Sequence, residues 1–238
     1  MAHTAPSATA PQPGGGTTLT ARALLLDMDG TLVNSDAVVE RVWTDWAREH
    51  GFDPRDVLPV VHGRQGYATM AELLPERPMA ENHAENRRLL ARETAETDGV
   101  VAIPGAARFL AAIEHAPHAL VTSADAALAR ARMAAAGLRM PRVRVTAESV
   151  AASKPDPEGF LKAAAELGAD PADCVVLEDS GAGVAAGHAA GMRVVGVGAR
   201  AAAFAPAAHV RTLADLRAEV LPDGAVRLTV AGAAPAAG

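Results

Sequence analysis

Near the start of the chain stands the stretch Ala23-Leu24-Leu25-Leu26-Asp27-Met28-Asp29-Gly30-Thr31, an apolar run that ends in two aspartates and a glycine. A continuous apolar run of this length is typical of a strand buried on both faces, as in a parallel sheet. Four similar runs follow along the chain: Ala119–Val121, Val143–Val145, Cys174–Leu177 and Val194–Val197. The first stretch therefore predicts the opening strand of a parallel sheet, with Asp27 and Asp29 directly after it.

Helical patterns separate these apolar runs. Pro104–Glu114 begins with a proline, which favours the first helical position, and Asp125–Ala136 and Asp156–Leu167 each end just before a glycine. Alternation of strands and helices predicts the α/β class, with a doubly wound parallel sheet, or Rossmann-like core.

One connection is much longer than a crossover requires. From Asn34 to Val101 no strand is expected, and helical patterns appear at Asp36–His50, Tyr67–Leu74 and Glu81–Thr97. We therefore expect a core formed by residues 21–33 and 102–230, with an inserted all-helical cap at 34–101. Residues 1–20 and 231–238 are rich in Ala, Pro and Gly and are expected to be disordered tails.

Composition narrows the possible partners. Hydrophobic residues make up 50% of the 238-residue chain and the net charge is −6, which argues for a sizeable core and against nucleic acid or an anionic membrane as partner. The single cysteine, Cys174, excludes an internal disulfide framework and a cysteine-based zinc site. The sequence shows neither a signal peptide nor an apolar run long enough to span a bilayer, so we expect a cytoplasmic protein.

Polar residues follow the predicted strands. Ligands of open α/β sheets bind at the carboxyl ends of the strands, where this sequence places Asp27, Asp29, Thr122, Ser123, Glu178 and Asp179. Four acids at one sheet edge would repel one another unless a cation lay among them, and carboxylate oxygens suit Mg²⁺. A lysine, a hydroxyl group and exposed backbone amides beside that cation describe a phosphate pocket.

Each motif taken alone has a more ordinary interpretation. Asp27 and Gly30 could belong to a simple turn, Thr122 to a helix cap, and Glu178 to a helix start. Lys154 could be a surface side chain, but the chain has only two lysines, and this one lies in Ser153-Lys154-Pro155-Asp156-Pro157. Their joint occurrence after successive strands favours a site.

Together these motifs resemble the haloacid dehalogenase superfamily. The resemblance spans roughly residues 22–200, in the family's motif order: Leu26-Asp27-Met28-Asp29-Gly30-Thr31-Leu32-Val33-Asn34-Ser35, Val121-Thr122-Ser123, Lys154-Pro155-Asp156-Pro157 and Glu178-Asp179-Ser180-x-Ala182-Gly183. The inserted helices are similar to that family's helical cap. The likeness is greatest to bacterial sugar phosphatases and to the yeast 2-deoxyglucose-6-phosphate and glycerol-phosphate phosphatases.

The resemblance implies a role for each motif residue. Asp27 would be the nucleophile that forms an aspartyl-phosphate, Asp29 the general acid and then base, and Lys154 the cation that pairs with phosphate and nucleophile. Thr122, Ser123 and Gly30 would surround the phosphate. Mg²⁺ would be held by the Asp27 carboxylate, the Asp29 carbonyl and the Asp179 carboxylate, with Glu178 in or beside its coordination shell.

The cap is expected to select the substrate. We interpret Arg64, in His62-Gly63-Arg64-Gln65, as a substrate-binding side chain, and His62 as a weaker candidate. Trp43 and Trp46 lie one helical turn apart and are expected in the cap core. Asn34 could contact either the substrate or the cap.

These inferences predict a Mg²⁺-dependent phosphatase that acts on a small phosphorylated metabolite, a sugar or polyol phosphate monoester. The alternative is a phosphomutase of the β-phosphoglucomutase type, which shares the first chemical step. A dehalogenase would not need Asp29, and a phosphonate hydrolase would need a cap lysine, which residues 34–101 lack. A receiver domain is about half this size and has no helical insertion.

Overall fold

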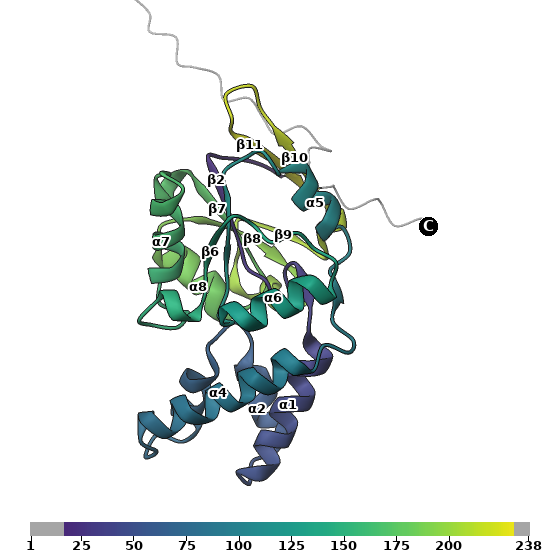
Figure 1. Cartoon of the computed structure of the whole chain (residues 1–238). Helices are drawn as coiled ribbons and strands as arrows, with labels where there is room; N and C mark the ends of the chain where they lie inside the picture. Colours follow the sequence, from purple (N-terminus) through teal and green to yellow (C-terminus); the bar gives the residue numbers. More distant parts are fainter. Residues whose placement is uncertain (1–16, 231–238) are drawn as a thin grey trace, which may run out of the picture.

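The computed structural model describes residues 17–230, so that residues 1–16 of the tail predicted at 1–20, and all of the tail predicted at 231–238, lie outside the described residues. A six-stranded parallel sheet in the order β6-β5-β2-β7-β8-β9 forms its centre (Figure 1). The strands are β2 (Ala23–Leu26), β5 (His118–Val121), β6 (Val143–Val145), β7 (Cys174–Glu178), β8 (Arg193–Val197) and β9 (Ala208–Val210). The doubly wound class and five of these strands are confirmed, whereas β9 was not predicted.

Helices cover both faces of this sheet. They are α5 (Ala106–Ala112), α6 (Ala126–Ala135), α7 (Glu158–Glu166), α8 (Gly181–Ala189) and the short α9 (Gly198–Ala201). Single 3₁₀ turns are found at η1 (Ala147–Ser149), η2 (Pro171–Asp173), η3 (Ala202–Phe204) and η4 (Leu213–Asp215). Because β2 is apolar throughout, Leu24 and Leu26 pack with α5 and α6 on one face, and Leu25 packs with α7 and α8 on the other.

A second, antiparallel sheet corrects one expectation about the tails. Strands β1 (Thr18–Ala21), β11 (Val226–Val230) and β10 (Leu216–Val220) pair in that order, so residues 18–20 are not part of a disordered tail. The backbone of β1 is held by its ladder with β11, and Leu19, opposite Leu228, packs against the main core. Backbone pairing and one apolar side chain thus order a segment that composition alone classified as tail.

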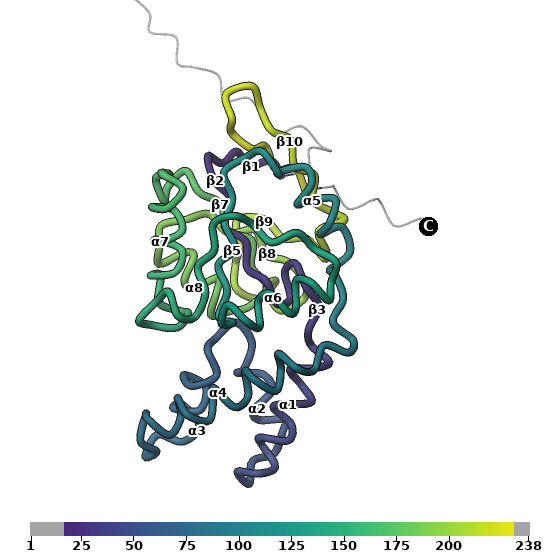
Figure 2. Tube along the Cα trace, viewed as in Figure 1, coloured from purple at the N-terminus to yellow at the C-terminus, as the bar shows by residue number. Residues whose placement is uncertain are grey.

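Four helices come after β2 in the chain and lie at the end of the molecule opposite β10 (Figure 2). They are α1 (Asp36–Glu49), α2 (Pro54–Val61), α3 (Gly66–Leu73) and α4 (Met79–Ala95). Trp43 and Trp46 are buried there with Met70 in a separate apolar cluster, as expected for the tryptophans.

The segment that enters this helical region and the segment that leaves it pair with each other. A two-residue strand on each, β3 (Val33–Asn34) and β4 (Val101–Ala102), forms an antiparallel pair, although no strand was expected from Asn34 to Val101. The short helix α2 was also not predicted. None of the helices within residues 17–230 has both the length and the apolar character that crossing a bilayer requires.

Candidate active site

Lys154 lies at the centre of the predicted residues, beyond the carboxyl ends of β2, β5 and β7. Its Nζ donates to Asp27 Oδ1 and to Glu178 Oε1, each at 2.7 Å, and to the Val121 carbonyl at 3.2 Å. The backbone holds Asp27 in place, since its N–H donates to the Leu177 carbonyl of β7 at 3.0 Å. The structure therefore brings together side chains that are up to 151 residues apart in sequence (Asp27 and Glu178).

The electrostatics of this group follow from burial. Desolvation raises the pKa of Asp27 well above its usual range, although the charge of Lys154 opposes the shift. Burial alone would lower the pKa of Lys154, but the carboxylates of Asp27 and Glu178 outweigh it and raise that pKa. Lys154 therefore stays charged and stabilises the anionic form of Asp27.

Three buried carboxylates form a candidate cation site. One oxygen from each of Asp27, Glu178 and Asp179 lies within 4.8 Å of the others. Oδ1 of Asp179 is buried without a hydrogen-bond partner among residues 17–230. Burial, together with the charge of Glu178, raises the pKa of Asp179 to about 7. An unpartnered carboxylate oxygen among hard oxygen donors fits Mg²⁺.

Gly30 lies directly beside the Asp179 carboxylate, where a side chain would not fit. Its φ is +82°, a left-handed conformation that favours glycine, and a Cβ there would lie 2.0 Å from Asp179 Oδ2. A glycine at this position beside the site therefore has a steric basis, because a larger residue would collide with the Asp179 carboxylate.

Both oxygens of the Glu178 carboxylate accept hydrogen bonds from the protein. Its Oε2 accepts from the Ser180 backbone N–H at 2.8 Å and from the Ser180 hydroxyl at 2.9 Å, while Oε1 accepts from Lys154. These contacts suit a carboxylate beside the coordination shell, which is one of the two positions that the sequence left open.

The Asp29 side chain does not belong to the acidic group and has hydrogen-bond partners of its own. Ser35 Oγ donates to Asp29 Oδ1 and Arg132 Nη1 donates to Asp29 Oδ2, each at 2.7 Å. Its carboxylate is therefore separate from the three candidate ligand side chains, in line with a proton-transfer role and with coordination only through its carbonyl.

The residues after β5 contact both their own segment and the helical region at 34–101. Thr122 Oγ1 accepts from the Ala124 N–H at 3.1 Å, and Ser123 Oγ donates to the Gly63 carbonyl at 3.0 Å. Thr122 and Ser123 also line a cavity of about 70 Å³ together with Asp27 and Asp29.

The helical region forms the other wall of this cavity. Arg64 and His62 both line it, so the structure places these two predicted residues at the site. Arg64 is also ion-paired with Glu72. Burial, with the nearby charge of Arg200, lowers the pKa of His62. Asn34 instead accepts from the Asp36 N–H at 3.1 Å, at the start of α1.

Two arginines of the site were missed by the sequence reasoning. Arg200 Nη2 lies 2.8 Å from Asp179 Oδ2, and its Nη1 lies 3.0 Å from Asp36 Oδ2. Arg132 pairs with Asp29 and with Glu93 of α4. Arg132 could have been found, because it lies on the apolar stripe of a predicted helix with Leu128; for Arg200 the sequence carries no such signal.

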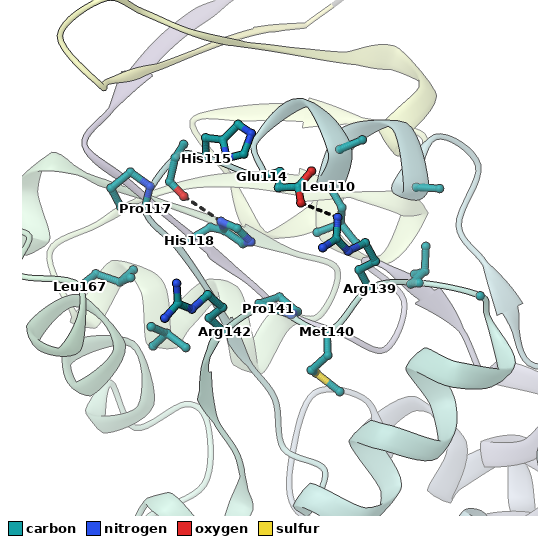
Figure 3. A pocket seen from close by; sticks show the side chains of 16 residues that line it. Leu110, Glu114, His115, Pro117, His118, Arg139, Met140, Pro141, Arg142 and Leu167 are labelled. Atoms are coloured by element: carbon teal, nitrogen blue, oxygen red, sulfur yellow. Dashed lines mark hydrogen bonds and ion pairs between the residues drawn. The ribbon is translucent and has the colours of Figure 1, made fainter.

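A larger hollow lies elsewhere, at the amino ends of β5 and β6 (Figure 3). It has a volume of about 890 Å³, and its lining includes His118, Arg139 and Arg142. None of the predicted site residues lines it. The smaller cavity, which several of the predicted site residues line, is therefore the candidate active site.

The geometry agrees with comparisons against known proteins. Residues 21–191 match the family described as haloacid dehalogenase-like hydrolase. The chain belongs to this family, and its curated relatives make it a phosphoric monoester hydrolase.

Two of those relatives span most of the chain. Hexitol phosphatase A of Escherichia coli is 44% identical over 76% of this chain and 84% of its own length. Glycerol-1-phosphate phosphohydrolase 2 of Saccharomyces cerevisiae is 30% identical over 75% of each chain.

Solved structures share the fold. CbbY from Rhodobacter sphaeroides in complex with phosphate has a TM-score of 0.66 at 25% identity and covers 82% of this chain and 96% of its own. β-Phosphoglucomutase from Clostridium difficile has a TM-score of 0.72 at 20% identity, over 83% of this chain and 93% of its own.

Proposed function

We propose that this chain is a Mg²⁺-dependent phosphatase that hydrolyses small sugar or polyol phosphate monoesters through an aspartyl-phosphate on Asp27. The observation that carries the proposal is the pairing of Asp27 with Lys154 at 2.7 Å, beside the unpartnered carboxylate oxygen of Asp179. A buried nucleophile, a fixed cation and a candidate metal ligand meet at the carboxyl edge of the parallel sheet, which is what attack on an anionic ester requires.

Asp27 and Asp179 would hold the metal through their carboxylates and Asp29 through its carbonyl, with Glu178 supporting them from beside the shell. When bound, Mg²⁺ would neutralise charge on the phosphate and on the attacking carboxylate. Arg200, which contacts Asp179 at 2.8 Å, would have to share that carboxylate with the cation.

In the first step, a carboxylate oxygen of Asp27 attacks the phosphorus in line. A new P–O bond to Asp27 forms while the ester P–O bond breaks, and Lys154 stabilises the charge that gathers on the phosphoryl oxygens. Asp29, in its protonated form, gives its proton to the departing alkoxide, which leaves as an alcohol. Thr122 and the Ser123 amide bind phosphate oxygens.

In the second step, Asp29 is a carboxylate and takes a proton from water. The water oxygen attacks the phosphorus of the aspartyl-phosphate, the P–O bond to Asp27 breaks, and inorganic phosphate is released. The electron pair of that bond returns to Asp27, so the enzyme is restored with Asp29 protonated for the next turnover.

The substrate class follows from the relatives and from the cap. The names of the two curated relatives describe a hexitol phosphatase and a glycerol-1-phosphate phosphohydrolase, so an acyclic polyol phosphate is the first substrate to test. We propose that residues 34–101 act as the cap and that residues 21–33 and 102–230 form the catalytic core. Arg64 would contact the substrate from the cap side of the cavity.

A phosphomutase is the alternative, since the same core could return the phosphoryl group to a sugar instead of to water. The β-phosphoglucomutase neighbour is 20% identical and supports the fold alone. The two curated phosphatases, at 44% and 30% identity, favour hydrolysis.

A phosphate-release screen tests the proposal. We expect the protein with Mg²⁺ to release phosphate from hexitol and glycerol phosphates, and we expect EDTA to abolish the release. Ca²⁺ should not replace Mg²⁺, because its longer bonds and larger ligand number disturb the in-line geometry at Asp27. Conversion of hexose 1-phosphate to 6-phosphate without phosphate release would favour the mutase, and full activity in EDTA would contradict the metal site.

A further inference from the structure

Arg132 is a buried charge at the junction of the two parts of the molecule. It belongs to α6 of the core, its side chain is 4% exposed, and it lines the cavity beside Asp29. Its neighbours on the buried face of α6 include Leu128 and Met133. Helix α6 packs against α4, the helix that carries Glu93 (Figure 1).

The two ends of the guanidinium fork bind different parts of the chain. Nη1 donates to Asp29 Oδ2 at 2.7 Å, and Nη2 donates to Glu93 Oε2 at 2.8 Å. The Glu93 side chain is 8% exposed, so solvent does not compete for this contact. One rigid group therefore connects the proposed acid–base residue to a helix of the cap.

A contribution to folding stability does not by itself explain why Arg132 is buried between two carboxylates. A buried ion pair often contributes no more than apolar residues of the same volume, and Leu89 and Leu90 already pack from α4 against the core cluster. A functional reason is that Asp29 has both oxygens fixed, one by Ser35 and the other by Arg132. A proton donor acts well only when its position is held to within ~0.5 Å.

We propose that Arg132 is a positioning residue for Asp29, and that Glu93 of the cap positions Arg132 in turn. The proposal rests on the proposed function, because it assigns Asp29 the proton transfer. It assigns the cap a role beyond substrate contact, namely to hold the acid–base carboxylate through one buried guanidinium.

The proposal predicts a dependence on the leaving group. A sugar or polyol alkoxide needs a proton as it leaves, whereas p-nitrophenolate leaves readily without one. If Arg132 acts through Asp29, its loss should slow phosphorylation by an alkyl phosphate more than by an aryl phosphate. A merely structural role would slow both reactions by the same factor.

The experiment measures single-turnover phosphorylation of the full chain with glycerol 1-phosphate and with p-nitrophenyl phosphate. The variants are Arg132→Lys, which keeps the charge but loses the fork, Glu93→Gln, which keeps the shape but loses the charge, and the double variant. Arg77→Lys is the matched control, because Arg77 also joins two acidic side chains of the cap, Glu81 and Glu85, away from the cavity.

For Arg132→Lys we expect the alkyl-to-aryl rate ratio to fall about tenfold or more, within the range of general acid catalysis. Glu93→Gln should shift the ratio in the same direction by a smaller factor. The double variant should be no worse than Arg132→Lys, since the two residues act in series. Arg77→Lys should leave the ratio unchanged.

The proposal is overturned if the alkyl-to-aryl rate ratio stays within twofold of wild type in both single variants. This holds even if the rates with both esters fall by the same factor. Additive effects in the double variant would also overturn the part assigned to Glu93. Failure of the proposed function looks different: the wild-type protein would then form no phosphoenzyme with either ester. Should Arg132→Lys fold poorly, Glu93→Gln alone decides, because glutamine keeps the volume of glutamate.

Discussion

At the residue scale, the site consists of buried and half-buried charges, in which each of three cations contacts two carboxylates. Lys154 joins Asp27 to Glu178, Arg132 joins Asp29 to Glu93, and Arg200 joins Asp179 to Asp36. A buried charge is costly unless it is paired and hydrogen-bonded, so each cation fixes the position of its carboxylates. The proposed nucleophile, the proposed acid and the candidate metal ligand are therefore each held by a different cation.

The separation of Asp29 from the acidic group leads to a first prediction. Asp29→Ala should leave Mg²⁺ binding intact, because its side chain is not a proposed ligand, and should slow phosphorylation by alkyl phosphates ~10²–10⁴-fold. The loss with p-nitrophenyl phosphate should be much smaller at that step. Rapid-quench measurement of both reactions checks this, and equal losses would show that Asp29 is not the acid.

The pKa of Asp179, raised to about 7, predicts a pH dependence of metal binding. Because this folded-state pKa lies above the unfolded value, the stability it gives the metal-free protein is present at acid pH and is lost as pH rises through about 7. A cation requires the deprotonated carboxylate, so Mg²⁺ affinity should be roughly tenfold weaker at pH 6 than at pH 8.

Thermal denaturation with and without Mg²⁺ measures this effect. Mg²⁺ should raise Tm more at pH 8 than at pH 6, and Asp179→Asn should reduce this difference. An equal Mg²⁺-induced shift at both pH values would show that Asp179 does not titrate with the metal.

The residues of the central group could be predicted because they follow apolar runs in chain order. Asp27 and Asp179 needed only that order and the rule that strand ends meet at one sheet edge, whereas Lys154 also needed the scarcity of lysine in the chain and the family resemblance. Arg132 and Arg200 could not be placed in the same way, because each also contacts an acid on a helix, Glu93 or Asp36, and the sequence does not specify how these helices pack. The position of Arg132 within an apolar stripe was the one available sign.

At the scale of elements, the accuracy of prediction follows the degree of burial. Strands β2, β5, β7 and β8 are largely buried and therefore appear as nearly continuous apolar runs, whereas β6 has the exposed Arg144 between its two valines. Strands β10 and β11 are half exposed, and the turn between them, Pro222-Asp223-Gly224, was the signal that could have revealed the hairpin. Helix α2 begins at Asp53-Pro54, a recognisable start, but contains a second proline, Pro59, that obscured it.

The cap helices carry the prediction for substrate selection. Arg64→Ala should lower kcat/KM for the preferred polyol phosphate about ten- to hundred-fold, which corresponds to ~1.5–3 kcal/mol of lost interaction. A small aryl ester should be affected far less, and Arg64→Lys should restore only part of the loss because the planar fork is missing.

Arg55→Ala is the matched control, since Arg55 is also a cap arginine but its side chain is 89% exposed. It should change kcat/KM by less than about twofold for both substrates, as exposed substitutions usually do. Similar small effects for Arg64→Ala would move substrate selection to another part of the cap.

At the scale of the whole molecule, residues of the proposed cap and of the proposed core line the same cavity. Its volume of about 70 Å³ is far smaller than the ~300–1,000 Å³ typical of ligand sites, so we expect the proposed cap to move when substrate enters. The contacts that such a movement must break or carry along include Ser123 with Gly63, Arg132 with Glu93, and Arg200 with Asp36. The same few polar contacts therefore join the site residues to the helices of the proposed cap.

The most direct test of the account is phosphate release from glycerol 1-phosphate by Asp27→Asn compared with wild type. The amide is a poor nucleophile and no longer offers a charged ligand, and phosphate monoesters hydrolyse so slowly without an enzyme that acceleration reaches up to ~10²¹-fold. The account predicts that the variant releases no phosphate above background while it remains folded. Near-wild-type release by Asp27→Asn would contradict it.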